Sequence, residues 1–155
     1  MLHRERLYGV MKDMKEDSVE TIELQMALLV RRVTSVTPNR KSGSLDRSAY
    51  LLLHQISSQG LAGVKALAEE FQLDISTASR QAGALELKGY VRKVPDPQDG
   101  RSYFYQITDS GTQELTAYKQ IRLDHITRLV SDWAEEDRQK FGDLLLKFNH
   151  SLMKR

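Results

Sequence analysis

The chain has 155 residues, with 23 Lys and Arg against 21 Asp and Glu, so its formal net charge is +2. Hydrophobic residues make up 40% and charged residues 28%, which is typical of a folded protein long enough for one domain with its own core. The absence of cysteine excludes disulfides, thiolate catalysis, thiol redox sensing and cysteine-ligated zinc. No apolar run spans a bilayer and the N-terminus lacks a secretory core, so we expect a cytoplasmic protein without membrane contact.

The first clear helical period follows Asp17, which is the expected N-cap. Apolar residues then recur every three or four positions on one stripe: Val19, Ile22, Met26, Leu29, Val33 and Val36. The pattern predicts a helix over 18–37, whose stripe packs either in the chain's own core or against a second chain. The polar segment 37–44, with Pro38 and Gly43, is expected to be a loop.

Three shorter helices are expected next. The first runs from about 46 to 58 and should bury Ala49, Leu52, Leu53 and Ile56. The other two lie within 64–88 and should bury Val64, Leu67, Ala68 and Phe71, and then Ile75, Ala78, Ala82 and Leu85. Because a turn of about three residues separates them and Gly89 stops the second, they are typical of a helix-turn-helix.

Two β-prone segments follow directly. Residues 90–94, ended by Pro95, and the aromatic-rich residues 102–107 flank a turn that contains Asp99-Gly100. A hairpin over about 90–107 behind a helix-turn-helix predicts a winged helix. A long helix after the cap Thr108, a break near 131–136 and a last apolar-striped helix complete a mainly α protein with one β-hairpin wing. That last stripe comprises Phe141, Leu144, Leu145, Phe148 and Leu152.

Several short motifs add to this order of elements. The wing reads Asp96-Pro97-x-Asp99-Gly100-Arg101, and Ile107-Thr108-x-x-Gly111 follows it. Upstream stand Val64-x-x-Leu67-Ala68, Ser76-Thr77-Ala78-Ser79-Arg80 and Leu85-Glu86-x-Lys88-Gly89-Tyr90-Val91. In these motifs the sequence resembles the MarR family of bacterial winged-helix transcription regulators.

The resemblance implies a single winged-helix domain over 1–155. Residues 45–108 would form the DNA-binding lobe, and helices over 18–37 and 109–153 would form a homodimer interface. It also implies a double-stranded, pseudo-palindromic DNA operator, repression of transcription, and release of the DNA by a small-molecule effector. The candidate effector-pocket residues are Met26, Val30, Tyr50, His54 and Tyr118.

The outward face of the second helix of the motif carries the candidate DNA contacts. Arg80 can pair with the O6 and N7 atoms of guanine, and Gln81 with adenine. Ser76 and Thr77 can hold bases or phosphates, while Ser79 lies at the edge of this face. Further candidate phosphate contacts are Arg47, Lys65, Arg92 and Lys93; since side chains alternate along a strand, at most one of the last two faces the duplex. The alternative is an ordinary solvated helix face.

Arg101 follows the wing tip and has two interpretations. Its guanidinium could enter a minor groove, where the negative potential favours arginine. Alternatively, it could form an ion pair with Asp99 or Asp96 that stiffens the hairpin. The sequence leaves both open.

Two departures from the family pattern matter. Gly83-Ala84 stands where many relatives carry polar or basic side chains, so base readout should depend on the first half of the helix. Without cysteine, the thiol-based peroxide-sensing branch of the family is excluded.

Other functions receive little support. The four histidines are dispersed and no catalytic motif is present, so we expect no metal, no cofactor and no enzyme. The rival hypothesis is a winged helix that docks a protein and does not bind DNA sequence-specifically. Positive charge concentrates in 30–50 and 75–108 on an otherwise acidic chain, which predicts a selective rather than a general DNA binder.

Overall fold

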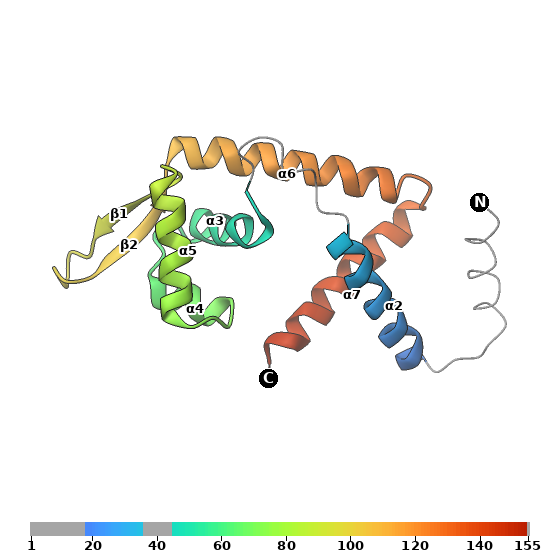
Figure 1. The fold of residues 1–155 in the computed structure, drawn as a ribbon. Coiled ribbons are helices and arrows are strands. Elements are labelled where there is room, and N and C mark those ends of the chain that lie inside the picture. Colours follow the sequence, from blue (N-terminus) through green and yellow to red (C-terminus); the bar gives the residue numbers. More distant parts are fainter. Residues whose placement is uncertain (1–17, 36–44, 155) are drawn as a thin grey trace. The chain divides into compact units, whose positions relative to one another are not determined.

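The computed structural model describes residues 18–35 and 45–154 (Figure 1). Its elements in chain order are α2 (Ser18–Ser35), α3 (Arg47–Gln59), α4 (Val64–Glu70), α5 (Ile75–Leu87), β1 (Val91–Pro95), β2 (Tyr103–Ile107), α6 (Asp109–Leu129) and α7 (Glu135–Met153). The contacts divide the chain into two units, Met1–Gly43 and Ser44–Arg155, and α2 is the described part of the first. The predicted mainly α fold with one antiparallel hairpin is confirmed.

Helix α2 covers most of the helix predicted over 18–37. The expected cap Asp17, the stripe residue Val36 and the expected loop 37–44 lie outside the described residues. Within α2, the stripe residues Val19, Ile22, Met26 and Leu29 are exposed. This amphipathic helix therefore leaves an apolar face open to solvent.

The core of the second unit lies where α3, α4, α5, the hairpin and the first turns of α6 meet. Its buried residues are Leu45, Leu52, Leu53, Ile56, Ala62, Leu67, Ala82, Leu85, Val91, Tyr105, Leu115 and Tyr118. Asp46 is the N-cap of helix α3, and its Oδ1 accepts the backbone N–H of Ala49 at 2.8 Å. It ends at Gly60, whose φ of 75° lies in the left-handed region that glycine adopts readily.

Helices α4 and α5 form the predicted helix-turn-helix. The backbone N–H of Leu73 in the turn donates to the carbonyl of Ala68 at 2.8 Å, which closes α4 before α5 begins. On α5, Ala78, Ala82 and Leu85 are buried, and the small alanines allow close helix packing. The sequence also predicts that Ile75 is buried, but Ile75 is 57% exposed, because it is the first residue of α5 and lies at the open end of the helix within the described residues.

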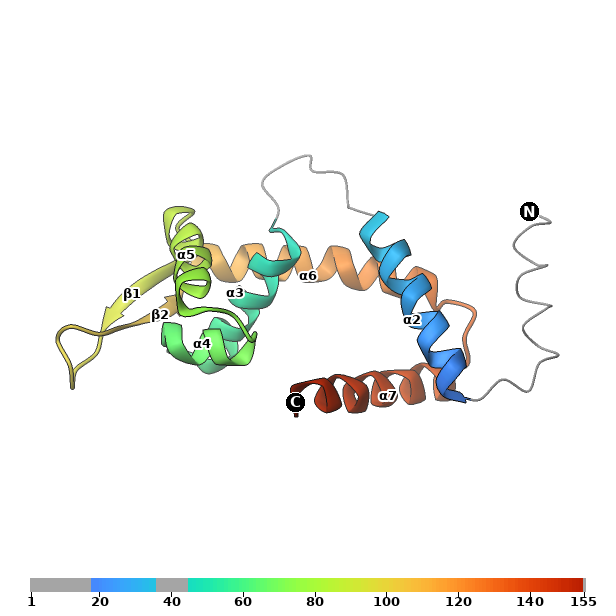
Figure 2. The ribbon, with the colours of Figure 1, turned by 60° about the horizontal axis from the view of Figure 1, so that its bottom comes forward.

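Strands β1 and β2 pair antiparallel, with Val91 opposite Ile107 and Pro95 opposite Tyr103. Pro95 therefore belongs to the first strand, although the sequence predicted that it would end the strand. The backbone of Ala62 pairs with Tyr105 through two hydrogen bonds of 2.8 and 2.9 Å, which attaches the hairpin to the lobe. From this base the hairpin projects as an arm beyond α3, α4 and α5 (Figures 1 and 2).

Helix α6 has two different halves. Leu115 and Tyr118 in its first half are buried in the lobe core, whereas Ile121, Ile126 and Leu129 are exposed. The lobe predicted over 45–108 thus also includes the first turns of α6, since these side chains complete its core. Helix α7 has no buried residue. No helix in the described part of the chain is long and apolar enough to cross a bilayer.

Candidate nucleic-acid interface

The first half of α5 presents a polar outward face. Ser76 and Arg80 are exposed on the side opposite Ala78 and Ala82, and Thr77, Ser79 and Gln81 are partly exposed at the edges of this face. Because residues 76 and 80 are one helical turn apart, their side chains lie along one line. This face can donate and accept hydrogen bonds along a groove of a duplex.

In the second half of α5, the line that begins with Ser76 and Arg80 continues with residues that have no polar side chain. Gly83 has open space around the position of a Cβ, Ala84 is exposed and Leu87 is 91% exposed. The side chains of Gly83, Ala84 and Leu87 have no group that can hydrogen-bond a base. Readout by the first half of the helix stays a prediction.

The wing tip is braced by its own carboxylates. Asp96 Oδ1 accepts the backbone N–H of Gln98 at 2.8 Å, and Asp99 Oδ1 accepts the backbone N–H of Arg101 at 3.0 Å. Backbone bonds from Asp96 to Ser102 and from Ser102 to Asp99 close the turn at 3.0 and 2.9 Å. The two aspartates of the wing motif therefore hold the tip in one conformation.

The ion pair between Asp99 and Arg101, one of the two interpretations that the sequence leaves open, is not formed in the described part of the structure. The two residues do interact, but through the backbone N–H of Arg101, because the carboxylate of Asp99 folds back onto the turn. Within the described ranges 18–35 and 45–154, the guanidinium of Arg101 forms no ion pair with any carboxylate. Its side chain is exposed at the wing tip.

Arg92 and Lys93 have different partners, as expected for neighbours on a strand. The Nε and Nη2 atoms of Arg92 donate to Gln106 Oε1 at 3.0 and 2.6 Å. Lys93 Nζ lies 3.2 Å from Glu86 Oε2 at the end of α5. Glu86 was not among the predicted functional residues, since only the turn between α5 and β1 brings it to Lys93.

The aromatic side chains of β2 support this face of the hairpin. Lys93 Nζ lies 4.7 Å above the centroid of the Tyr103 ring, which meets the buried Tyr105 ring edge to face at 5.5 Å. Burial raises the pKa of Tyr105, and a hydrogen bond with Tyr103 together with the nearby charges of Tyr103 and Glu86 adds to that rise.

The other predicted phosphate contacts are not brought together with these residues. Arg47 and Lys65 are exposed in the first turns of α3 and α4. Their role in binding DNA stays a prediction.

The predicted effector residues Tyr50, His54 and Tyr118 form an aromatic cluster between α3 and α6. The centroid of the Tyr50 ring lies 4.9 Å from that of Tyr118 and 6.1 Å from that of His54. The Arg122 guanidinium lies over both tyrosines, at 5.6 and 5.9 Å from their centroids. In the sequence, Arg122 only interrupted an apolar stripe; its stacking depends on the packing of α3 against α6. Met26 and Val30 belong to α2 and stay predictions.

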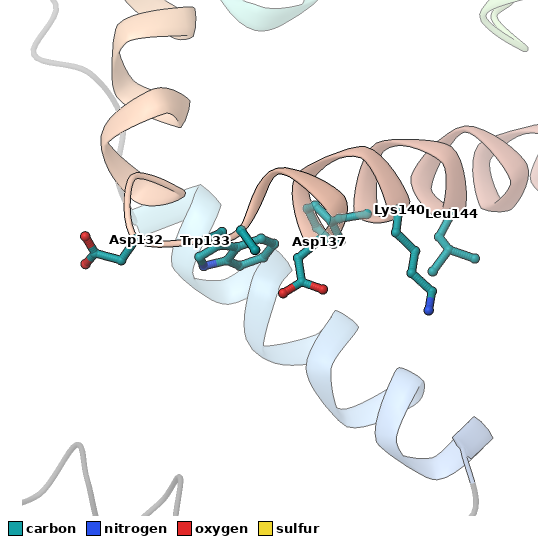
Figure 3. Close-up of a pocket in the computed structure, with 7 residues that line it drawn as sticks. Asp132, Trp133, Asp137, Lys140 and Leu144 are labelled. Carbon is teal, nitrogen blue, oxygen red and sulfur yellow. The ribbon is translucent and has the colours of Figure 1, made fainter.

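A separate open hollow lies where α6 passes into α7 (Figure 3). Trp133, Lys140 and Leu144 line it, and Trp133 meets Phe141 edge to face at 5.4 Å between ring centroids. Asp132 and Asp137 also belong to its lining.

A helix-turn-helix with an exposed polar second helix and an attached, braced hairpin defines a winged-helix DNA-binding protein. Comparisons with known proteins agree. The sequence model of the MarR family matches residues 45–103. The chain is also 41% identical over 139 residues to the HTH-type transcriptional regulator YxaD of Bacillus subtilis (strain 168), covering 89% of this chain and 97% of that protein. The chain belongs to the MarR family and is a DNA-binding transcriptional regulator.

Solved structures show the same fold. FabT of Streptococcus pneumoniae, crystallised in complex with DNA, matches with a TM-score of 0.70 at 16% identity, covering 88% of this chain and 99% of FabT. PcaV of Streptomyces coelicolor, crystallised with its natural ligand, matches with a TM-score of 0.67 at 21% identity, covering 90% of this chain and 99% of PcaV.

Proposed function

We propose that this regulator is a homodimeric repressor that binds a pseudo-palindromic operator sequence-specifically. Helix α5 enters a major groove with Arg80 and its polar neighbours, and the wing carries Arg101 into the adjacent minor groove. The observation that carries the proposal is the pairing of a polar, exposed half of α5 with a braced wing whose guanidinium has no carboxylate partner among the described residues.

We propose a dimer because α7 and the end of α6 expose apolar side chains. The stripe residues Phe141, Leu144 and Leu145 of α7 and the end of α6 are open to solvent. A contiguous exposed apolar face is costly to hydrate and typical of a protein–protein interface. Two lobes related by a two-fold axis would read two inverted half-sites about one helical turn of DNA apart.

Control by a small molecule is a further part of the proposal. The Tyr50, His54 and Tyr118 cluster between α3 and α6 would line the effector site. A ligand that binds one arrangement of the lobes better than another shifts the dimer toward or away from DNA binding. The fold shared with PcaV, which was crystallised with a ligand, supports this hypothesis. A regulator of this kind acts where the chromosome lies, so we place it in the cytoplasm.

Selection of bound duplexes from a random library tests the proposal. We expect an inverted repeat to emerge after several rounds, with half-site centres about 10 base pairs apart or a multiple of that spacing. If the protein instead docks other proteins, the selected pool will stay random, and no duplex will be retained at physiological salt.

A further inference from the structure

A side-chain ion pair joins the last turn of the recognition helix to the wing. Glu86 Oε2 on α5 lies 3.2 Å from Lys93 Nζ on β1, and the two side chains are 35% and 45% exposed. The same ammonium group lies 4.7 Å above the centroid of the Tyr103 ring on β2. Lys93 is thus held from two sides, by a carboxylate of the helix and by an aromatic face of the hairpin.

The connection continues into the lobe core. Tyr103 meets Tyr105 edge to face at 5.5 Å, and Tyr105 is only 1% exposed. A line of side-chain contacts therefore runs from α5 through β1 and β2 to the buried base of the hairpin. The backbone supplies a short link at the same place, where the Tyr90 N–H donates to the Leu85 carbonyl at 3.0 Å.

Because this ion pair lies at the base of the hairpin, a small change of angle there would move the wing tip by a larger distance. At about 3.3 Å per residue the tip lies roughly 20 Å beyond Val91, so a tilt of about 10° at the base would move it by roughly 3 Å. Arg101 stands at that tip. A shift of this size is enough to take a guanidinium out of hydrogen-bonding reach of a groove.

We propose that Glu86 and Lys93 are positioning residues that set the angle between the wing and the recognition helix. They let Arg101 reach its minor groove while α5 occupies the major groove. The inference rests on the proposed function, because it matters only if both elements engage one duplex. Lys93 then supports DNA binding through Glu86 and the hairpin, and not as a contact to phosphate.

The two roles of Lys93 predict opposite effects of Glu86→Gln. If Lys93 contacted a phosphate, removing the carboxylate would free its ammonium group and remove a negative charge beside the duplex, so binding would tighten. If the pair sets the angle of the wing, Glu86→Gln loosens the wing and binding weakens. For a half-exposed pair we expect a loss of about 2–5-fold in affinity.

The experiment measures the affinity of the dimer for the selected operator by fluorescence anisotropy, for wild type, Glu86→Gln, Arg101→Ala and the double variant. We expect Arg101→Ala to cost less in the Glu86→Gln background than in wild type, because a mispositioned wing has already lost part of that contact. Hydroxyl-radical footprints should lose protection in the minor groove beside each half-site and retain it where α5 binds. A merely stabilising ion pair would lower the melting temperature and leave the footprint and the coupling unchanged.

Glu135→Gln is the matched control, since it removes the same charge from the Glu135–Arg138 pair of α7 at 2.8 Å. It should bind DNA as wild type does. The charge-exchanged variant Glu86→Lys with Lys93→Glu provides a second arm, and it should recover affinity relative to Lys93→Glu alone. Equal or tighter operator binding by Glu86→Gln, or no recovery in the exchanged pair, overturns the inference. Failure of the wild type to select any operator would instead overturn the proposed function.

Discussion

Gly111 packs directly against the backbone of Tyr90, and a β-carbon at position 111 would collide with the Tyr90 carbonyl oxygen. That oxygen accepts the backbone N–H of Thr108 at 3.0 Å. The Thr108 hydroxyl donates to the Gly89 carbonyl at 2.6 Å and accepts the Gly111 N–H at 3.0 Å. The Ile-Thr-x-x-Gly motif thereby fastens the start of α6 to the end of the recognition helix.

Replacing Gly111 with alanine should destabilise the fold strongly. The new methyl group would have to displace backbone and would also meet Ile107 Cγ1 at 2.9 Å, so we expect a loss of about 2–3 kcal/mol in the free energy of unfolding. Urea denaturation at a fixed dimer concentration measures it. Gly83→Ala is the control: nothing lies within 4 Å of its Cβ position, and it should stabilise α5 by about 0.5–1 kcal/mol.

Removing the Thr108 hydroxyl should cost about 1–2 kcal/mol, because Thr108→Val leaves the Gly111 N–H without its cap. Thr116 also carries a hydroxyl in α6, but there it only donates to the preceding Thr112 carbonyl at 2.8 Å on an exposed face. Thr116→Val should therefore stay within about 0.5 kcal/mol of wild type. Equal melting curves for the two variants would contradict the capping role.

The two arginines of the interface should have distinct effects. Arg80→Ala should lose about 1–3 kcal/mol of discrimination between operator and scrambled duplex, because a base-reading guanidinium is removed. Arg101→Ala should weaken binding to both duplexes alike and lower the salt slope by about one. Anisotropy titrations at several salt concentrations separate these effects. If Arg80→Ala discriminates between the two duplexes as well as wild type does, Arg80 does not read a base.

The proposed dimer interface can be probed with two adjacent leucines of α7. Leu145 lies on the apolar stripe and is 40% exposed, whereas Leu146 points off the stripe and is 71% exposed. We expect Leu145→Asp to give monomers with much weaker operator binding, since two half-sites no longer bind together. Leu146→Asp should stay dimeric. Sedimentation velocity distinguishes these states, and a dimeric Leu145→Asp protein would contradict the proposed interface.

Local patterns were sufficient to predict most of the fold. The cap at Thr108 and the buried periods of α3 and α5 predicted where those elements lie, because these signals act within a few residues. Ile75 belongs to the apolar period of α5 but is exposed, because burial at a helix end depends on what covers that end. Likewise, Pro95 could join a strand because this two-stranded hairpin leaves β1 with a free edge.

The site was less predictable, since its details depend on contacts between elements. The exposed polar face of α5 followed from its buried period alone. By contrast, the sequence allowed a guanidinium–carboxylate pair between Arg101 and Asp99, and only the turn geometry directs that carboxylate to the backbone. The partners of Lys93 and Arg122 come from neighbouring elements, so no spacing along one segment could indicate them.

The central claim is that α5 and the wing read a specific duplex. The most direct test is the ratio of the dissociation constants of the wild-type dimer for a scrambled duplex and for the selected operator, at physiological salt. The account predicts that the operator binds at least about 1,000-fold more tightly. Equal affinity for the two duplexes would contradict it.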